Sequence, residues 1–307
     1  MSFTKVICLF IGMLSFNALF LQSKKTFKYV KNDSTKLKVD VFLPKTKRKD
    51  ITKVPLVIFV HGGGFSDRTR KDGYNFCKFL AKNNIAGATI DYTLFMKGKD
   101  FGCNGNTEEK KQTIFNVANQ IKQATSYLIE KSERLKIDTT KIFLAGTSAG
   151  AESILHAIYI KNEFDNRLPK DFKYKGLIAG AGALVDIDLI TETNKIPMFL
   201  FHGTNDQTVP YKTGSHRNCP ENASGYLNLF GSYSITKHME ALQGTCQLFS
   251  ITDGEHHVGD TYFYYQQHYI LRFIEDVFAG DPFIRYETKK VISSKQLIPT
   301  EFTEFQY

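Results

Sequence analysis

The sequence lacks the features that mark several large classes of protein. Its 307 residues contain no tryptophan, no internal repeat and no low-complexity segment. No C-x-x-C motif or His/Cys cluster is present, which argues against a structural metal site. The longest apolar run, Val6 to Leu21, is interrupted by Ser15 and Asn17. Because it is too short for a comfortable membrane span, the sequence disfavours repeat, metal-centred and membrane-spanning architectures.

The N-terminal run has the pattern of a secretory signal peptide. Lys5 gives a short positive region before the apolar stretch, and the polar residues Gln22 to Lys25 follow it. This order predicts a signal peptide over residues 1–23, with cleavage near Ser23, while retention as a membrane anchor is the alternative. We therefore expect a secreted or periplasmic protein without stable membrane insertion after cleavage.

The rest of the chain has the composition of an ordinary globular protein. Hydrophobic residues make up 42% and charged residues 23% of the sequence, and 26 Phe and 15 Tyr supply aromatic bulk. We expect residues 24–307 to form a single domain, with residues 281–307 as a C-terminal tail on its surface.

Four cysteines remain once the signal segment is excluded, an even number that permits disulfides in an exported protein. Three pairings are possible among Cys77, Cys103, Cys219 and Cys246. We favour Cys103–Cys219, because both residues lie in polar, loop-like stretches. Cys77 lies on the face of a predicted helix and is typical of a core residue.

The net charge of +9 suggests affinity for anionic surfaces or polymers. However, the lysines at 44–53 and 95–111 are scattered over loops without regular aromatic interleaving. We therefore predict a solvated basic face and no nucleic-acid partner.

Strand-like and helix-like patterns alternate along the chain, which predicts an α/β fold. Residues 54–60 form a near-continuous apolar run, typical of a strand buried on both faces. The expected strands are 27–30, 37–43, 54–60, 86–92, 141–145, 175–179, 197–201 and 246–251. The expected helices are 72–83, 112–135, 149–160, 233–243 and 262–278. We predict a mostly parallel central sheet of about eight strands with helices on both faces.

Two glycine motifs follow predicted strands, at the edge where active sites of parallel sheets lie. The first is His61-Gly62-Gly63-Gly64-Phe65 and the second is Gly146-Thr147-Ser148-Ala149-Gly150. Ser148 stands between a strand and a helix, so a sharp turn would lift its hydroxyl out of the sheet as a nucleophile. The amides of Gly63, Gly64 and Ala149 are candidates for an oxyanion hole. We expect His61 to brace the loop.

A serine nucleophile needs a base and an orienting acid, and later loops offer both. His256 follows the strand at 246–251 and is our candidate base, with His257 as the alternative. Asp206 follows the strand at 197–201 and is the candidate acid. We interpret His202 as structural and place His216 in a mobile loop. Residues 93–112 and 203–232 are long loops, which we expect to flank the site.

These motifs resemble those of the α/β-hydrolase fold, specifically the carboxylesterase/lipase group that carries HGGGF and G-x-S-A-G. The resemblance covers about residues 27–280, and the stretch HGTNDQTVPY from His202 is similar to the acid loop of that group. The short stretch 183–196 leaves no room for a large lid. The resemblance implies a serine carboxylesterase with the chain order Ser, Asp, His. Such an enzyme needs no metal or organic cofactor, and we expect an open site for short-chain acyl esters or polymer-linked esters.

Two other readings stay open at this stage. A secreted serine peptidase of the same fold would need the same three residues, and a non-catalytic binding protein could retain the fold. The sequence does not choose between His256 and His257, and it identifies neither the natural ester nor the oligomeric state.

Overall fold

The computed structural model describes residues 23–31, 36–45, 53–161, 167–280, 283–293 and 296–305. The predicted signal peptide, 1–23, lies outside these ranges except for Ser23. In the ranges that are described, no helix combines the length and the apolar character needed to cross a membrane.

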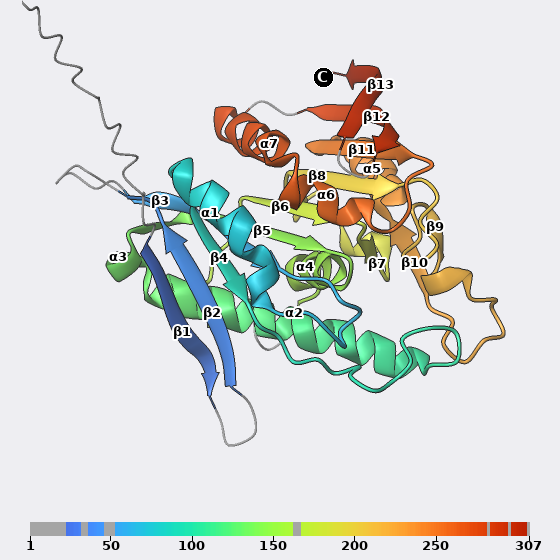
Figure 1. Ribbon diagram of the computed structural model, residues 1–307, viewed down its shortest axis with the longest axis horizontal. Coiled ribbons are helices and arrows are strands. Elements are labelled where there is room, and N and C mark those ends of the chain that lie inside the picture. Colours follow the sequence, from blue (N-terminus) through green and yellow to red (C-terminus); the bar gives the residue numbers. More distant parts are fainter. Residues whose placement is uncertain are drawn as a thin grey trace, which may run out of the picture.

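A twisted sheet of ten strands runs through the centre of the molecule (Figure 1). The strands, in spatial order, are β1 (Ser23–Lys31), β2 (Lys36–Leu43), β4 (Ala86–Ile90), β3 (Val54–Val60), β5 (Ile137–Thr147), β6 (Gly176–Gly180), β8 (Met198–Gly203), β11 (Cys246–Thr252), β12 (Ile284–Ser293) and β13 (Gln296–Phe305). The seven strands from β4 to β12 are parallel, whereas β1, β2 and β13 make antiparallel pairs at the two edges.

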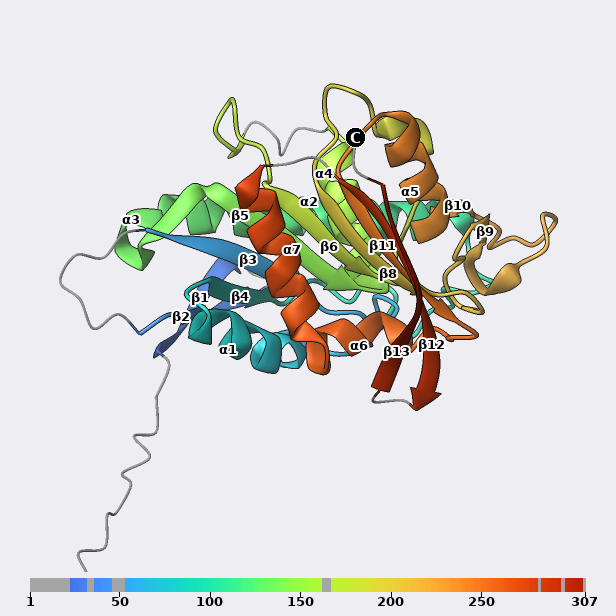
Figure 2. The same ribbon diagram turned by 90° about the horizontal axis from the view of Figure 1, so that it is seen from above.

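Helices cover both faces of this sheet (Figure 2). On one face lie α1 (Tyr74–Lys82), α6 (Val258–Tyr264) and α7 (Gln267–Ala279); on the other lie α2 (Thr107–Glu130), α3 (Ser132–Leu135), α4 (Ala149–Tyr159) and α5 (Ser232–Ala241). Along β3 the side chains alternate between these layers. Leu56 and Ile58 join the cluster that contains α2 and α4, while Val57 and Phe59 join the cluster with α1 and α7. Burial on both faces explains the continuous apolar run of this strand.

A smaller sheet lies beyond the carboxyl ends of the central strands. It consists of β7 (Ala183–Leu184), β10 (Asn228–Gly231) and β9 (Thr213–Ser215), in that spatial order. The short helices η1 (Arg70–Gly73), η3 (Ile187–Leu189) and η4 (His216–Asn218) complete the described elements. The loop expected over 203–232 therefore contains β9, η4 and β10.

The prediction of an α/β fold with helices on both faces is confirmed, and each of the eight predicted strands is present. The predicted surface tail is wrong, because residues 284–305 form two further strands and bring the sheet to ten. β12 pairs in parallel with β11, and Phe283 and Ile284 are buried in the core. The charged residues that follow Ile284 conceal this strand in the sequence.

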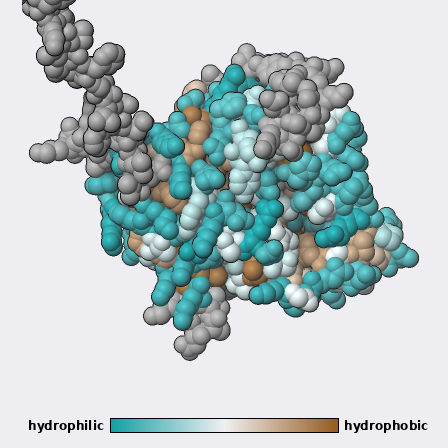
Figure 3. Space-filling view, in the orientation of Figure 1, coloured by the Kyte–Doolittle hydropathy of each residue, from teal (hydrophilic) through white to brown (hydrophobic). Residues whose placement is uncertain are grey.

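The outer surface is mainly polar. On the face shown in Figure 3, hydrophilic residues predominate and hydrophobic residues form small, separate patches. Among the described residues, Tyr265 and Phe278 are the large hydrophobic side chains that are exposed.

Ending the chain after Gly280 should destabilise the protein. This removes the buried apolar side chains of Phe283 and Ile284, each worth about 1.5–3 kcal/mol, and exposes the edge of β11. We expect the free energy of unfolding in urea to fall by about 3–6 kcal/mol. Ending the chain after residue 295, which removes only β13, is the control and should cost much less. Equal stability of the two truncated chains would contradict the packing of β12 against the core.

Candidate active site

Ser148 occupies a tight turn between the end of β5 and the start of α4. Its backbone is left-handed, with φ 51° and ψ −125°, and its amide donates to the carbonyl of Gly180 at 2.8 Å. A non-glycine residue in this conformation costs about 1–3 kcal/mol and persists only where the surroundings hold it. At Gly150, a Cβ atom would lie 2.2 Å from the carbonyl oxygen of Val60, so only glycine lets α4 approach β3 this closely.

His256 is the histidine that the structure brings to this serine. It lies on the loop between β11 and α6, and its Nε2 is 2.8 Å from Ser148 Oγ. Its Nδ1 is 2.7 Å from Asp206 Oδ2. His257, the alternative from the sequence, is exposed and directly precedes α6. The geometry thus connects Ser148, His256 and Asp206 in one chain of hydrogen bonds.

Asp206 is buried, and its two carboxylate oxygens accept four hydrogen bonds. Oδ1 accepts from the amides of Thr208 at 2.7 Å and Val209 at 3.0 Å, while Oδ2 accepts from His256 and from His202 Nε2 at 3.0 Å. Burial disfavours the charged carboxylate, but the hydrogen bonds from His202 and His256 and their electrostatic attraction outweigh it and lower the pKa of Asp206. The acid therefore stays ionised through the neutral range.

His202 is the second imidazole on this carboxylate, a contact that the sequence reading did not foresee. Its Nε2 also lies 3.2 Å from the carbonyl oxygen of Val209. A carbonyl only accepts, so the proton resides on Nε2, and Nδ1 accepts from Ser232 Oγ at 2.9 Å. His202 is fully buried and donates to the same carboxylate oxygen as His256. The spacing of four residues between His202 and Asp206, at the end of a strand, is the sequence signal that could have revealed this contact.

The glycine loop after β3 lies against the serine turn. Gly63 and Gly64 have φ of 100° and 58°, and the carbonyl of Gly63 accepts from the amides of Ser66 and Asp67 at 3.0 and 3.1 Å. Within the described part of the chain, the amides of Gly63 and Gly64 donate to no other group. Ala149 is the first residue of α4, whose amide has no acceptor inside the helix. Three donors are thus available to an oxyanion.

Two aromatic side chains brace this loop. Tyr92 donates from its hydroxyl to the carbonyl of Gly62 at 2.9 Å, and its ring stacks on His61 with centroids 4.2 Å apart. His61 donates from Nδ1 to the same carbonyl at 2.8 Å. Burial lowers the pKa of His61, which favours the neutral imidazole in this role.

Two cavities meet at Ser148. The smaller is about 160 Å³ and includes Phe101, Ala149, Glu152, Val209, His216 and Arg217 in its lining. The larger is a cleft of about 760 Å³ that includes Arg68, Thr147, Gln207, His256, His257 and Asp260. His256 belongs to the larger cleft and not to the smaller cavity, so the two sides of the serine differ chemically.

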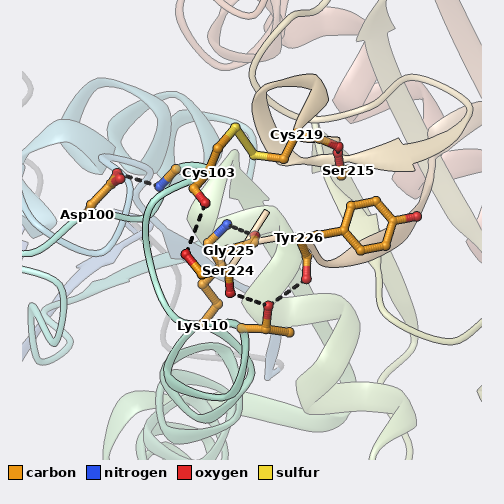
Figure 4. The surroundings of a disulfide bond; sticks show 10 residues. Asp100, Cys103, Lys110, Ser215, Cys219, Ser224, Gly225 and Tyr226 are labelled. Carbon is orange, nitrogen blue, oxygen red and sulfur yellow. Dashed lines mark hydrogen bonds between the residues drawn. A yellow bond between two sulfur atoms is a disulfide. The ribbon is translucent and has the colours of Figure 1, made fainter. Parts of the chain in front are cut away.

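A disulfide joins the two long loops that wall the smaller cavity (Figure 4). Cys103 and Cys219, 116 residues apart, form the bond that we favoured from the sequence, so that prediction is confirmed. Beside it, the amide of Gly225 donates to the carbonyl of Cys103 at 2.9 Å, and Thr107 Oγ1 donates to the carbonyls of Ser224 and Tyr226. Between β6 and β8 the chain holds only β7 and η3 as regular elements, with no helical lid. One side of the site is nevertheless enclosed by these joined loops.

His216 is buried within that wall, so its expected place in a mobile loop is wrong. Its Nε2 lies 2.6 Å from Glu152 Oε1, and only 2% of the residue is exposed. Glu152, which the sequence reading did not select, follows Ser148 by one helical turn and is also buried. Within the described ranges, no group of three or more His, Cys, Asp or Glu side chains is arranged to hold a metal ion.

Comparison with known proteins supports the fold. A family model described as BD-FAE matches residues 39–187. Among solved structures, Thermogutta terrifontis esterase 2 phosphorylated by paraoxon superposes with a TM-score of 0.60 at 17% identity, covering 84% of this chain and 94% of the other. Its propionate complex gives 0.60 at 18% identity, with 83% and 94% covered. A lipase/esterase from Lactobacillus plantarum gives 0.58 at 12% identity, with 83% and 98% covered. No curated protein matches the sequence.

The likenesses to the solved structures extend over most of the chain and over nearly the whole of each structure, whereas the family model matches slightly less than half of the chain. The fold is that of the α/β-hydrolases, as the glycine motifs predicted, and the resemblance to the carboxylesterase group is confirmed.

Replacing both Cys103 and Cys219 with serine should destabilise the protein. A cross-link that closes a loop of this length restricts the unfolded chain and typically contributes about 2–5 kcal/mol. We expect the free energy of unfolding in urea to fall by that amount, and the same loss in the native protein treated with reductant. An unchanged transition midpoint would contradict a stabilising role for the bond.

Proposed function

We propose that this α/β-hydrolase is a serine carboxylesterase that removes short acyl groups from larger alcohols, including polymer-linked ones. The observation that carries the proposal is the chain of hydrogen bonds from Ser148 through His256 to Asp206, 2.8 and 2.7 Å long, beside three free amides. A nucleophile, a base, an orienting acid and oxyanion donors are the groups that acyl transfer requires.

In the proposed reaction, Ser148 Oγ attacks the ester carbonyl carbon while His256 Nε2 takes the hydroxyl proton. The amides of Gly63, Gly64 and Ala149 hold the resulting oxyanion, and Asp206 stabilises the imidazolium. Collapse of the tetrahedral intermediate breaks the bond to the alcohol, which leaves with the proton from His256. Water, activated by the same histidine, then hydrolyses the acyl-enzyme and restores Ser148.

The position of His256 sets the orientation of the ester. Because His256 must give its proton to the departing alcohol, the alcohol lies on its side of the serine, in the cleft of about 760 Å³. The acyl group then occupies the opposite, smaller cavity of about 160 Å³. A small acyl cavity beside a large alcohol cleft suits acetyl- to butyryl-sized groups on a bulky or polymeric alcohol.

The solved neighbours are consistent with this choice. Esterase 2 of Thermogutta terrifontis has structures with propionate and butyrate bound, and it is phosphorylated by paraoxon. We propose that this chain likewise reacts at Ser148 with organophosphorus reagents and accepts acyl groups of that size.

Export is part of the proposal. Residues 1–23 would act as a cleaved signal peptide, after which the protein is secreted or periplasmic and is not inserted in a membrane. The disulfide between Cys103 and Cys219 supports an oxidising destination, since such bonds are rare in reducing compartments. The expected partner is the ester itself, with no nucleic acid and no cofactor.

Purified protein should hydrolyse p-nitrophenyl acetate and butyrate faster than the octanoate, because the acyl cavity is small. Ser148→Ala should lower kcat by about 10⁴-fold or more, since it removes the nucleophile. A fluorophosphonate probe should label the native protein and not the variant. Labelling without turnover of any ester would favour the peptidase, and absence of both would favour a binding protein.

The two neighbouring histidines should differ sharply as bases. His256→Ala should lower kcat by about 10⁴-fold or more, because Ser148 loses its proton acceptor. His257→Ala should retain most of the activity, since its exposed side chain does not contact Ser148. Hydrolysis of p-nitrophenyl acetate by the two variants measures the difference, and the reverse pattern would transfer the role of base to His257.

A further inference from the structure

The acyl cavity contains a buried carboxylate that the proposed reaction does not use. Glu152 is 1% exposed, lies one turn after Ser148 on α4 and lines the cavity of about 160 Å³. Its Oε1 accepts a hydrogen bond from His216 Nε2 at 2.6 Å. A plain alkyl acyl group would be packed against this carboxylate and would cover it without replacing any lost hydrogen bond to water.

Only one of the two carboxylate oxygens of Glu152 is paired. Throughout the described ranges, Oε2 has no hydrogen-bond partner, whereas Oε1 is held by His216. Oε2 is not among the fully enclosed atoms that lack a partner, so it is accessible from the cavity, and a ligand that excludes water from it must supply a donor in its place. The cavity therefore offers a hydrogen-bond acceptor to the acyl group.

The other charged groups of the cavity indicate which kind of donor fits. Lys99 and Arg217 bring positive charge to the lining, and Asp100 and Glu152 bring negative charge, so the formal charges cancel. Lys99 is paired with Glu109, and the guanidinium of Arg217 makes no ion pair in the described part of the chain. A cationic acyl group would meet that unpaired guanidinium, which favours a neutral donor over an ammonium.

We propose that the acyl cavity selects short acyl groups that carry a hydroxyl on the carbon next to the ester carbonyl or on the following one. The hydroxyl donates to Glu152 Oε2, while His216 holds the carboxylate in place through Oε1. This inference rests on the proposed esterase function and specifies its substrate class as short hydroxyacyl esters.

Three methyl esters of similar size test which substituent the acyl cavity prefers on the carbon next to the ester carbonyl. Methyl propionate, methyl lactate and alanine methyl ester differ only in hydrogen, hydroxyl or ammonium at one carbon. Their kcat/KM values are measured at pH 6, below the ordinary α-amino pKa of about 7.7–8.0, and are divided by the hydroxide-catalysed rate constants. That division removes the intrinsic reactivity of each ester. We expect lactate to exceed propionate by about tenfold or more and to exceed the alanine ester.

Glu152→Gln tests whether Oε2 of Glu152 accepts the hydrogen bond from the acyl hydroxyl. The amide keeps an acceptor for His216 and replaces Oε2 with a donor of nearly the same size. The ratio of lactate to propionate should fall by about tenfold or more. Glu275→Gln, at an exposed position on α7, is the matched control and should leave the ratio unchanged. Thermal melting of both variants reports whether each is folded.

The outcomes separate the inference from the function on which it rests. Ser148-dependent hydrolysis without a preference for lactate, or with the preference intact in folded Glu152→Gln, overturns the inference and leaves the esterase standing. A preference for the alanine ester would contradict the proposal that the donor on the acyl group is neutral. If Glu152→Gln does not fold, the normalised wild-type ratios alone decide. No Ser148-dependent hydrolysis of any ester, p-nitrophenyl acetate included, overturns both proposals.

Discussion

The carboxylate of Asp206 is the constraint on which the rest of the site depends. Two backbone amides fix one oxygen, and His202 and His256 share the other. This arrangement sets the imidazole of His256 in the plane and tautomer that point Nε2 at Ser148. Because His202 is buried and anchored in turn by Ser232, the orientation of His256 depends on the packing between β8 and α5 as well as on its own loop.

The two cavities beside Ser148 are formed by different parts of the chain. The cleft on the side of His256 is bounded by the ends of the central strands and the start of α6, and it is wide. The opposite cavity is enclosed by two long loops that the disulfide and neighbouring hydrogen bonds tie together. In the proposed reaction, the ends of the central strands and the starts of the helices supply the reacting groups, while irregular loops shape the acyl side.

Much of the architecture could be predicted from the sequence because it depends on local signals. Some segments indicate their structural environment by composition alone. Examples are the apolar run at 54–60, the glycines beside Ser148 and the polar stretches around Cys103 and Cys219. The sequence does not reveal the strands at 284–305, since charged residues such as Glu287, Lys289 and Lys290 interrupt the apolar positions of β12 and its partner, β11, is distant in the sequence. The pair Glu152–His216 likewise arises only when the chain folds, because a histidine in an irregular segment carries no mark of its partner, whereas the four-residue spacing of His202 and Asp206 is a local signal.

The contact of Gly150 with the carbonyl of Val60 joins two halves of the site that are distant in sequence. The glycine loop begins directly after Val60, and the serine turn directly precedes Gly150. With no side chain between α4 and β3, the two segments pack directly against each other, which leaves little room for one to move relative to the other. The dipoles that would face the oxyanion are therefore oriented before any substrate arrives, and little reorganisation energy is left to supply at the transition state.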